Sequence, residues 1–112
     1  MADILYIVVP CYNEEEVLPE TARRLKAKLE GLIDAGTISP ESRALFVNDG
    51  SRDKTWSIIQ ALHRSDARFS GVNLSRNRGH QNALLAGLMT AKDRCDMAIS
   101  MDADLQDDID AV

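Results

Sequence analysis

The sequence predicts a single α/β domain built on a parallel β-sheet, with the element order β-α-β-α-β-α-β. Short apolar runs rich in β-branched residues alternate with longer segments whose apolar residues recur at steps of three and four. The links between these segments are short, so successive strands are expected to run parallel and to be joined by right-handed crossovers. A chain of 112 residues can bury one hydrophobic core but not two, which limits it to one domain or part of one.

The first strand and helix have the clearest patterns. Residues 4–9 form a continuous β-favouring run that ends at Pro10, which predicts a buried strand. Residues 16–34 predict an amphipathic helix, in which Pro19 is compatible with the first turn and which Gly36 terminates. The apolar positions of this helix are Leu18, Ala22, Leu25, Leu29, Leu32 and Ile33.

The second strand is predicted at residues 44–47, followed by a turn at 48–51 and a helix over 54–65. Three apolar side chains of that helix, Trp56, Ile59 and Leu62, recur at steps of three and would form its buried face. Ile58 lies beside them.

The third strand is predicted at residues 70–75 and the third helix at 80–92. Small residues around Gly87 would allow this helix to lie close to the sheet. The fourth strand is expected at 97–101, directly before Asp102.

Composition excludes several classes of protein. Hydrophobic residues make up 45% of the chain and charged residues 28%, which indicates a globular protein rather than a disordered one. The longest apolar run, 4–9, is too short to span a bilayer, and the N-terminus lacks the basic region of a secretory signal. Cys11 and Cys95 can form neither a disulfide framework nor a zinc site, so a reduced, cytoplasmic setting is expected.

The net charge of −5 is concentrated in one place, because five aspartates lie within residues 102–110. Without them the chain is electrically even, and nothing predicts the basic stripe that nucleic-acid binding requires. Two interpretations remain open: a local acidic site that holds a cation, and a solvated acidic segment.

Polar clusters follow all four predicted strands, at residues 10–14, 48–51, 76–81 and 102–104. Ligands of parallel sheets bind at the carboxyl ends of the strands, near the point where the strand order reverses. The four clusters are therefore expected to meet at one edge of the sheet and to form a site.

A metal site is one interpretation of Asp102, Asp104 and Gln106. Alternate residues of an extended segment point the same way, so the three side chains could offer oxygens to one cation. Ligands that are all oxygen favour Mg²⁺ or Mn²⁺ over zinc. The alternative is the N-terminus of a helix that carries acidic residues, which would also explain Asp107 and Asp108.

The first two clusters contain groups suited to an organic ligand. Asp49 could accept a hydrogen bond from an N–H of a nucleic base, Tyr12 could stack on the base, and Asn13 or Glu14 could bind its edge or the ribose. The alternatives are a turn-forming role for Asp49, which Asp-Gly-Ser performs without a ligand, and a structural role for Tyr12.

Arg76, Arg78 and His80 form the densest basic cluster, at a glycine-containing turn that enters a helix. Such a helix N-terminus suits an anion such as a diphosphate, although the arginines could equally offset the acidic cluster. His63 is expected to face solvent, and both cysteines are expected to pack without a catalytic role.

Together these motifs resemble the family 2 glycosyltransferases of GT-A fold, whose first part is Rossmann-like. The motifs that carry the resemblance are Val-Pro-Cys-Tyr-Asn-Glu at 9–14, Val-Asn-Asp-Gly-Ser at 47–51 and Asp-Ala-Asp-Leu-Gln at 102–106. The segment 75–81, with the small residues of 83–87, is similar to the branch of dolichol-phosphate mannose synthase and the bacterial polyprenyl-phosphate glycosyltransferases. The resemblance covers nearly the whole chain.

The resemblance implies an inverting, metal-dependent transferase that takes a sugar from a nucleotide-sugar donor, with a UDP-sugar favoured over a GDP-sugar. The implied acceptor is a polyprenyl phosphate or another glycan, as in cell-wall synthesis. The donor would be held by Pro10, Tyr12, Asn13, Glu14, Asp49, Arg78, His80 and Asp102, and Mg²⁺ or Mn²⁺ by Asp102, Asp104 and Gln106.

One departure from the family pattern affects these expectations. Family members continue past the metal motif with prolines and an acceptor half, whereas this chain continues over 107–112 and stops. Residues 1–112 are therefore expected to be the N-terminal donor-binding part of a longer protein, with no catalytic base and with little or no transfer of its own. The longer protein would lie in the cytoplasm, or at the cytoplasmic face of a membrane through C-terminal segments, and an exposed sheet edge would favour self-association.

Other functions remain open at this stage. A metal-dependent nucleotidyltransferase also uses an acidic pair at a strand end, but usually has a glycine-rich basic stretch where this chain has Pro-Cys-Tyr-Asn-Glu. A receiver-like signalling domain would use Asp49 as its phosphate acceptor. A nucleotide-binding module without catalysis is the third alternative.

Overall fold

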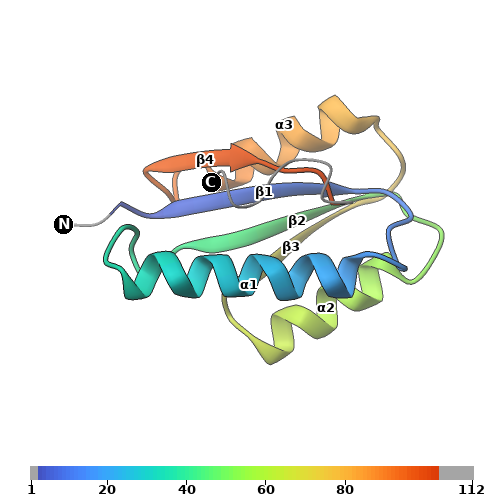
Figure 1. The fold of residues 1–112 in the computed structure, drawn as a ribbon. Helices are drawn as coiled ribbons and strands as arrows, with labels where there is room; N and C mark the ends of the chain where they lie inside the picture. Colours follow the sequence, from blue (N-terminus) through green and yellow to red (C-terminus); the bar gives the residue numbers. More distant parts are fainter. Residues whose placement is uncertain (1–2, 104–112) are drawn as a thin grey trace.

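The computed structural model describes residues 3–103 and confirms the predicted order of elements (Figure 1). The predicted metal ligands Asp104 and Gln106 lie outside the described residues, as do Asp107 and Asp108. The elements are β1 (Leu5–Cys11), α1 (Leu18–Asp34), β2 (Arg43–Asp49), α2 (Thr55–Ser65), β3 (Phe69–Leu74), α3 (His80–Ala91) and β4 (Met97–Ser100).

The four strands form one parallel sheet in the order β3-β2-β1-β4. The chain first builds outward from β1 to β2 and β3, and then places β4 on the other side of β1. The strand order therefore reverses between β1 and β4, which is where a parallel sheet offers its binding site.

Two strands are longer than the sequence predicts. Pro10 lies inside β1, opposite Val47 of β2. The last residue of β1 that pairs with β4 is Val8, opposite Ser100, so β4 has no partner for Pro10 and the missing N–H of the proline removes no ladder bond. In β2, Asn48 and Asp49 pair with β3 and belong to the strand rather than to the predicted turn.

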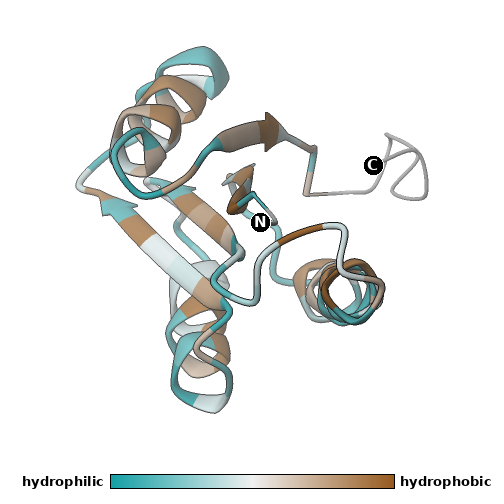
Figure 2. Ribbon diagram, turned by 90° about the vertical axis from the view of Figure 1, so that its left-hand side faces the viewer, coloured by the Kyte–Doolittle hydropathy of each residue, from teal (hydrophilic) through white to brown (hydrophobic). Residues whose placement is uncertain are grey.

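The helices cover the two faces of the sheet unequally, with α1 and α2 on one face and α3 on the other (Figures 1 and 2). The larger core lies under α1 and α2, where the rings of Phe46 and Phe69 have centroids 5.8 Å apart. The smaller core lies under α3 and includes Val8, Leu45 and Val47.

The helix α3 lies very close to the sheet, as its small residues predict. A Cβ atom on Gly87 would come within 2.4 Å of a methyl carbon of Val8 and 2.8 Å of one of Val47, so only glycine fits this contact. The outward side of α3 carries no Asp, Glu, Lys or Arg, and Leu85 and Met89 are 56% and 62% exposed there.

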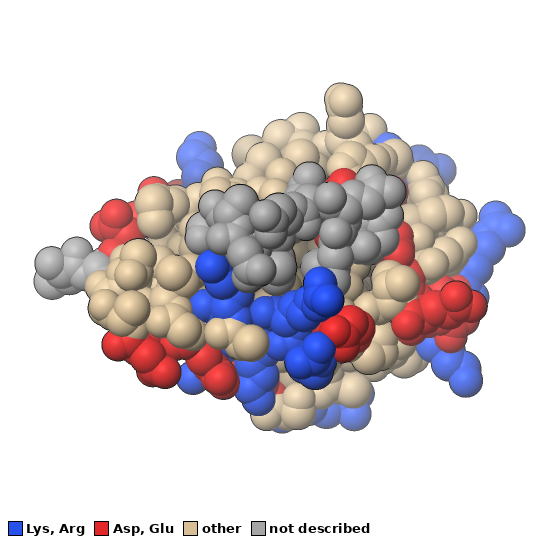
Figure 3. Space-filling view, viewed as in Figure 1, with Lys and Arg blue, Asp and Glu red and all other residues tan. Residues whose placement is uncertain are grey.

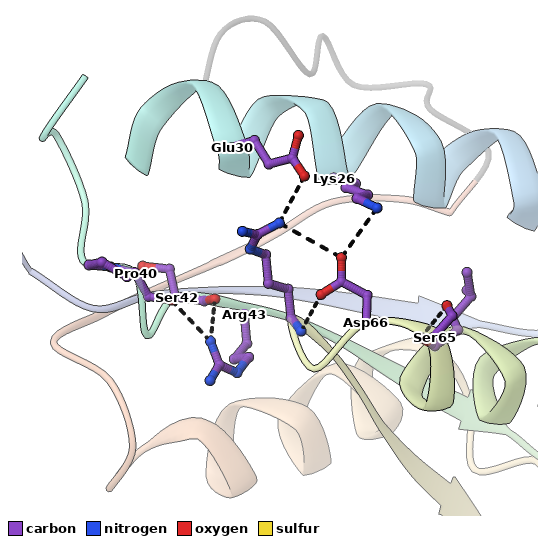
Figure 4. A network of polar contacts seen from close by, with 9 residues as sticks. Lys26, Glu30, Pro40, Ser42, Arg43, Ser65 and Asp66 are labelled. Carbon is purple, nitrogen blue, oxygen red and sulfur yellow. Dashed lines mark hydrogen bonds and ion pairs between the residues drawn. The ribbon is translucent and has the colours of Figure 1, made fainter. Parts of the chain in front are cut away.

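The outer side of α1 is strongly charged. Figure 3 shows Lys and Arg side chains gathered over this face of the molecule. Arg68, before β3, lies 2.8 Å from Glu30 of α1 and 3.7 Å from Asp66, and Lys26 lies 3.5 Å from Asp66 (Figure 4). Burial by itself raises the pKa of the Asp66 carboxyl, but the Arg68 N–H and the charges of Arg68 and Lys26 bring it below its usual value.

Within residues 3–103, none of the helices has the length and apolar character needed to cross a membrane.

Candidate nucleotide site

A pocket of about 340 Å³ lies at the carboxyl edge of the sheet. It combines residues at or just after the ends of β1, β2 and β4 with residues before and at the start of α3, so the expected meeting of the four polar clusters is confirmed. The lining residues are Pro10, Cys11, Tyr12, Glu14, Asp49, Asn77, His80, Asp102 and Ala103.

The wall nearest β1 carries Tyr12 and Glu14. Tyr12 follows the last residue of β1 and is 43% exposed, so its ring is available to a ligand. Asn13, between them, has a φ of 53°, in the left-handed region that asparagine tolerates better than most residues. Its backbone turns the chain out of the sheet, so that Tyr12 and Glu14 both line the pocket.

Asn13 itself is not among the lining residues. Its side-chain oxygen accepts a hydrogen bond from the backbone N–H of Arg52 at 2.9 Å, so the side chain faces the loop after β2. Its contact with a nucleoside stays a prediction.

Asp49 is the last residue of β2 and its side chain is almost fully buried. One carboxylate oxygen accepts a hydrogen bond from the backbone N–H of Arg78 at 2.6 Å. Among the described residues the other oxygen accepts no hydrogen bond, and it is not fully buried, so it can accept one from a ligand in the pocket.

Gly50 explains how Arg78 reaches Asp49. Its φ is 68°, and a Cβ there would lie 2.2 Å from the backbone nitrogen of Asn77 and 2.4 Å from the carbonyl carbon of Arg76. The loop after β3 therefore crosses directly over Gly50, a path that any side chain would block.

The opposite wall is formed by His80, the first residue of α3, and Asp102, just past β4. Nε2 of His80 lies 3.9 Å from Oδ1 of Asp102, and both side chains are well exposed. Gly79, with a φ of 90°, precedes the helix, and its N–H donates to the side-chain oxygen of Asn77 at 2.9 Å.

The arginines of the basic cluster are placed less directly. Arg78 contributes its backbone N–H to Asp49, and neither its side chain nor that of Arg76 lines the pocket. Neither arginine forms an ion pair within residues 3–103. Of the acidic cluster only Asp102 lies in that range, so the suggested offset of the cluster by the arginines stays a prediction.

Cys11 lines the floor of the pocket, although the sequence predicted only a packing role for it. Its side chain is 1% exposed and its thiol lies 3.3 Å from the carbonyl oxygen of Val9. Burial, followed by the negative charge of Glu14, raises the pKa of this thiol far above its usual value. The residue therefore stays protonated, which supports packing rather than a nucleophilic role.

Asn77 and Ala103 also line the pocket; both lie within the predicted polar clusters, but neither was predicted to bind a ligand. Asn77 could have been noticed as an amide side chain in the turn before a helix. No sequence pattern signals Ala103, whose carbonyl oxygen accepts a hydrogen bond from the hydroxyl of Thr21 in α1.

The two remaining residues behave as packing and surface groups. Cys95 is half-buried against the smaller core. His63 is exposed as expected, with Nδ1 2.6 Å from the carbonyl oxygen of Phe69, on the strand farthest from β4.

The fit of a divalent cation can be tested only at Asp102, the one predicted metal ligand within the described residues. Its exposed carboxylate at the pocket edge has the hard oxygen chemistry that Mg²⁺ and Mn²⁺ prefer. Residues 3–103 contain no group of three or more His, Cys, Asp or Glu side chains that could hold a metal.

Comparison with known proteins gives consistent results. The model of the family described as glycosyl transferase family 2 matches residues 6–112. The glycosyltransferase YkoT of Bacillus subtilis is 50% identical over 109 residues, which cover 97% of this chain and 32% of that protein. The undecaprenyl-phosphate 4-deoxy-4-formamido-L-arabinose transferase of Pseudomonas paraeruginosa is 40% identical over 105 residues, or 93% of this chain and 29% of that one. The chain thus spans about a third of the length of these relatives.

Solved structures agree on the fold. S. aureus TarS in complex with UDP superposes with a TM-score of 0.72 at 24% identity, over 90% of this chain and 27% of that one. The mannosyltransferase PcManGT from Pyrobaculum calidifontis, in complex with GDP-Man and Mn²⁺, gives 0.63 at 21% identity, over 93% and 28%. At these identities the similarity shows the fold, which confirms the predicted α/β architecture of GT-A type.

Proposed function

The chain belongs to glycosyl transferase family 2, and from this premise we propose that it forms the donor-binding part of an enzyme that transfers a sugar from a nucleotide-sugar. The observation that carries the proposal is the pocket itself. Side chains from all four polar clusters, far apart in sequence, meet there at the point where the strand order reverses.

The nucleoside is proposed to lie between Tyr12 and Asp49. A cavity of about 340 Å³ is at the small end of the range for ligand sites. The unpartnered oxygen of Asp49 would accept a hydrogen bond from a base N–H, Tyr12 would stack on the base, and Glu14 would bind the ribose. Among the structural neighbours, TarS is solved in complex with UDP and with UDP-GlcNAc and PcManGT in complex with GDP-Man, and we propose a UDP-linked donor for this chain.

The diphosphate is proposed to lie near His80. The first backbone N–H groups of a helix have no partner within the helix and carry a partial positive charge, so the start of α3 suits an anion. His80 would add a hydrogen-bond donor at this end of the helix. Arg78, whose side chain is exposed, precedes His80 by two residues.

Mg²⁺ or Mn²⁺ is proposed as the cofactor, held by Asp102 together with Asp104 and Gln106. A bound cation would neutralise the negative charge that develops on the departing diphosphate. The residues of the chain would hold the donor in one orientation, which is the part of catalysis that positioning supplies.

The acceptor is proposed to be a polyprenyl phosphate or another glycan, with inversion at the anomeric carbon. A phosphate oxygen is already anionic and needs no strong base, whereas a sugar hydroxyl requires one. Relatives such as the undecaprenyl-phosphate transferases support the lipid phosphate. We further propose that the acceptor site, and any base, correspond to the part of the longer relatives that these residues do not match, and that transfer takes place at the cytoplasmic face of a membrane. No observation favours a nucleotidyltransferase or a receiver-like domain.

Isothermal titration with UDP and with GDP, in the presence of Mn²⁺, tests the proposal. Binding is expected, and Asp49→Asn should weaken it about 10- to 100-fold, because a hydrogen bond to a charged acceptor is lost. Asp104→Asn should remove the dependence on Mn²⁺. Asp34→Asn, at the exposed end of α1, is the matched control and should bind like the wild type. A folded chain that binds neither nucleotide would show that the proposal is wrong for this chain.

A further inference from the structure

We propose that Asp53 and Thr55 are positioning residues of the pocket, because they hold the backbone of the segment that carries Tyr12 and Glu14. Neither residue lines the pocket. The inference rests on the proposed function for the identity of the ligand, whereas its structural part stands on the hydrogen bonds alone.

The segment in question is the β1–α1 loop, residues 12–17. Three successive backbone N–H groups of this loop donate to side chains that follow β2 rather than to the loop itself. Asn13 donates to Ser51 Oγ at 3.0 Å, Glu14 to Thr55 Oγ1 at 2.8 Å and Glu15 to Asp53 Oδ2 at 3.2 Å. Backbone N–H groups need partners, so the position of this loop depends on these three side chains.

The dependence runs in both directions. The side-chain oxygen of Asn13 accepts from the backbone N–H of Arg52 at 2.9 Å. Three of these four hydrogen bonds join the two loops, and the fourth joins the β1–α1 loop to Thr55, the first residue of α2. This is why Asn13 faces the β2–α2 loop (residues 50–54) instead of the pocket.

Asp53 is at the centre of this arrangement. Its Oδ1 accepts from both the backbone N–H and the hydroxyl of Thr55, at 2.9 and 2.6 Å, while Oδ2 reaches Glu15. Partial burial raises the pKa of this carboxyl, but the hydrogen bonds from Thr55 and Glu15 outweigh burial and lower it below its usual value. With this lowered pKa Asp53 is ionised at neutral pH, and its carboxylate accepts hydrogen bonds on both oxygens.

Thr55 passes the constraint on to the pocket. Its side chain is fully buried, and its hydroxyl donates to Asp53 while accepting from Glu14. The carbonyl oxygen of Glu14 in turn accepts from the N–H of Leu18 at 2.9 Å, where α1 begins. The backbone of Glu14 is therefore fixed at both ends, and its side chain and that of Tyr12 lie where the pocket needs them.

Two substitutions separate this role from simple folding. Asp53→Asn keeps an oxygen for Thr55 but turns an amide NH₂ toward the Glu15 N–H, so that two donors face each other. Thr55→Val keeps the shape of the side chain without the hydroxyl, and Thr55→Ser restores the hydroxyl. Lys54→Gln, an exposed change in the β2–α2 loop, is the matched control.

Amide hydrogen exchange on the unliganded chain is the first measurement. Asp53→Asn and Thr55→Val should speed exchange at Glu14 and Glu15 about tenfold, the effect of losing one net hydrogen bond. Amides inside β1 and α2 should keep their rates, and Thr55→Ser and Lys54→Gln should match the wild type. Unchanged exchange at Glu14 and Glu15 would overturn the proposal. If Asp53→Asn also speeds exchange inside β1, the comparison of Thr55→Val with Thr55→Ser decides whether the loop depends on these side chains.

Titration of the same variants with UDP and GDP is the second measurement. The dissociation constant should rise about tenfold in Asp53→Asn and Thr55→Val and recover in Thr55→Ser. Faster exchange with unchanged affinity would overturn the positioning role. If the wild type binds neither nucleotide, the proposed function is wrong for this chain. The exchange rates alone then decide whether Asp53 and Thr55 fix the backbone of the β1–α1 loop.

Discussion

The two faces of the sheet are packed by different means. Under α1 and α2 the core is thick, built from large side chains such as Phe46, Leu25 and Ile59, and the outer surface carries ion pairs. Under α3 the contact is thin, glycine lies directly on valine, and the outer surface is apolar. Both faces position the pocket: α1 and α2 are tied to the loops that carry Tyr12, and α3 begins at His80. From this comparison we expect the core under α1 and α2 to contribute most of the stability, and the α3 face to be the more sensitive to added side-chain volume.

The largest effect is expected in the thick core. Phe46→Ala should lower the free energy of unfolding by about 3–5 kcal/mol, because it leaves a cavity at a fully buried position. Leu45→Ala, at the residue before Phe46 in β2 and on the α3 face, should lower it by a smaller amount, about 2–3 kcal/mol. Urea unfolding of both variants measures the difference. Equal losses would show that the two faces contribute alike.

The close fit of α3 is tested by adding one methyl group. Gly87→Ala should destabilise the chain by about 1–3 kcal/mol, because the new Cβ overlaps Val8 and Val47. Gly31→Ala, in α1, has open space at the same atom and should stabilise by about 0.5–1 kcal/mol through helix propensity. Thermal unfolding of the pair distinguishes them, and a stabilising Gly87→Ala would contradict the tight contact.

The ion pairs of the α1 face predict a pH dependence. Because the pKa of Asp66 is lower in the folded chain than its ordinary 3.8, the carboxylate stabilises the fold above that value. The contribution is lost as the pH falls through the lowered pKa. Asp66→Asn should therefore cost about 1 kcal/mol or less near neutral pH and less still in acid. Chemical unfolding of the wild type and the variant at neutral and at acidic pH tests this. A difference in unfolding free energy between the two proteins that is larger in acid would contradict the prediction.

The smallest effect on stability is expected on the outer side of α3. Leu85→Gln and Met89→Gln should change the free energy of unfolding by less than about 0.5 kcal/mol, because both side chains are mostly exposed. Any self-association through this apolar side should weaken, which sedimentation velocity measures. A large loss of stability in the monomer would contradict the exposure of these residues.

Most of the fold follows from local patterns, and the exceptions have tertiary causes. The apolar runs place all four strands, but the turn-forming sequence Asn-Asp-Gly hides the last two residues of β2. Asn48 stays in the strand because it pairs with Asn73, and their side chains share a hydrogen bond of 2.8 Å. A contact with β3 cannot be inferred from turn propensity. Similarly, α1 begins at Leu18 rather than at residue 16, because the preceding residues are bonded to the β2–α2 loop.

The site was predictable in its location and less so in its details. The rule that strand ends converge places Tyr12, Asp49, His80 and Asp102 together. It could not show that Asn13 faces away, because that depends on the N–H of Arg52 in another loop. Nor could it separate Asp53 from an ordinary turn residue, since its partner Glu15 lies 38 positions away.

The rate at which the Cys11 thiol is alkylated would report how often the pocket opens. Its thiol forms part of the pocket floor yet is 1% exposed and held protonated, so an alkylating reagent can modify it only when the surrounding wall moves aside. Cys95, half-buried near the start of β4, serves as an internal reference in the same molecule. The ratio of the two alkylation half-lives would report how often the wall opens, and how far a bound ligand slows it, without any label being added to the protein.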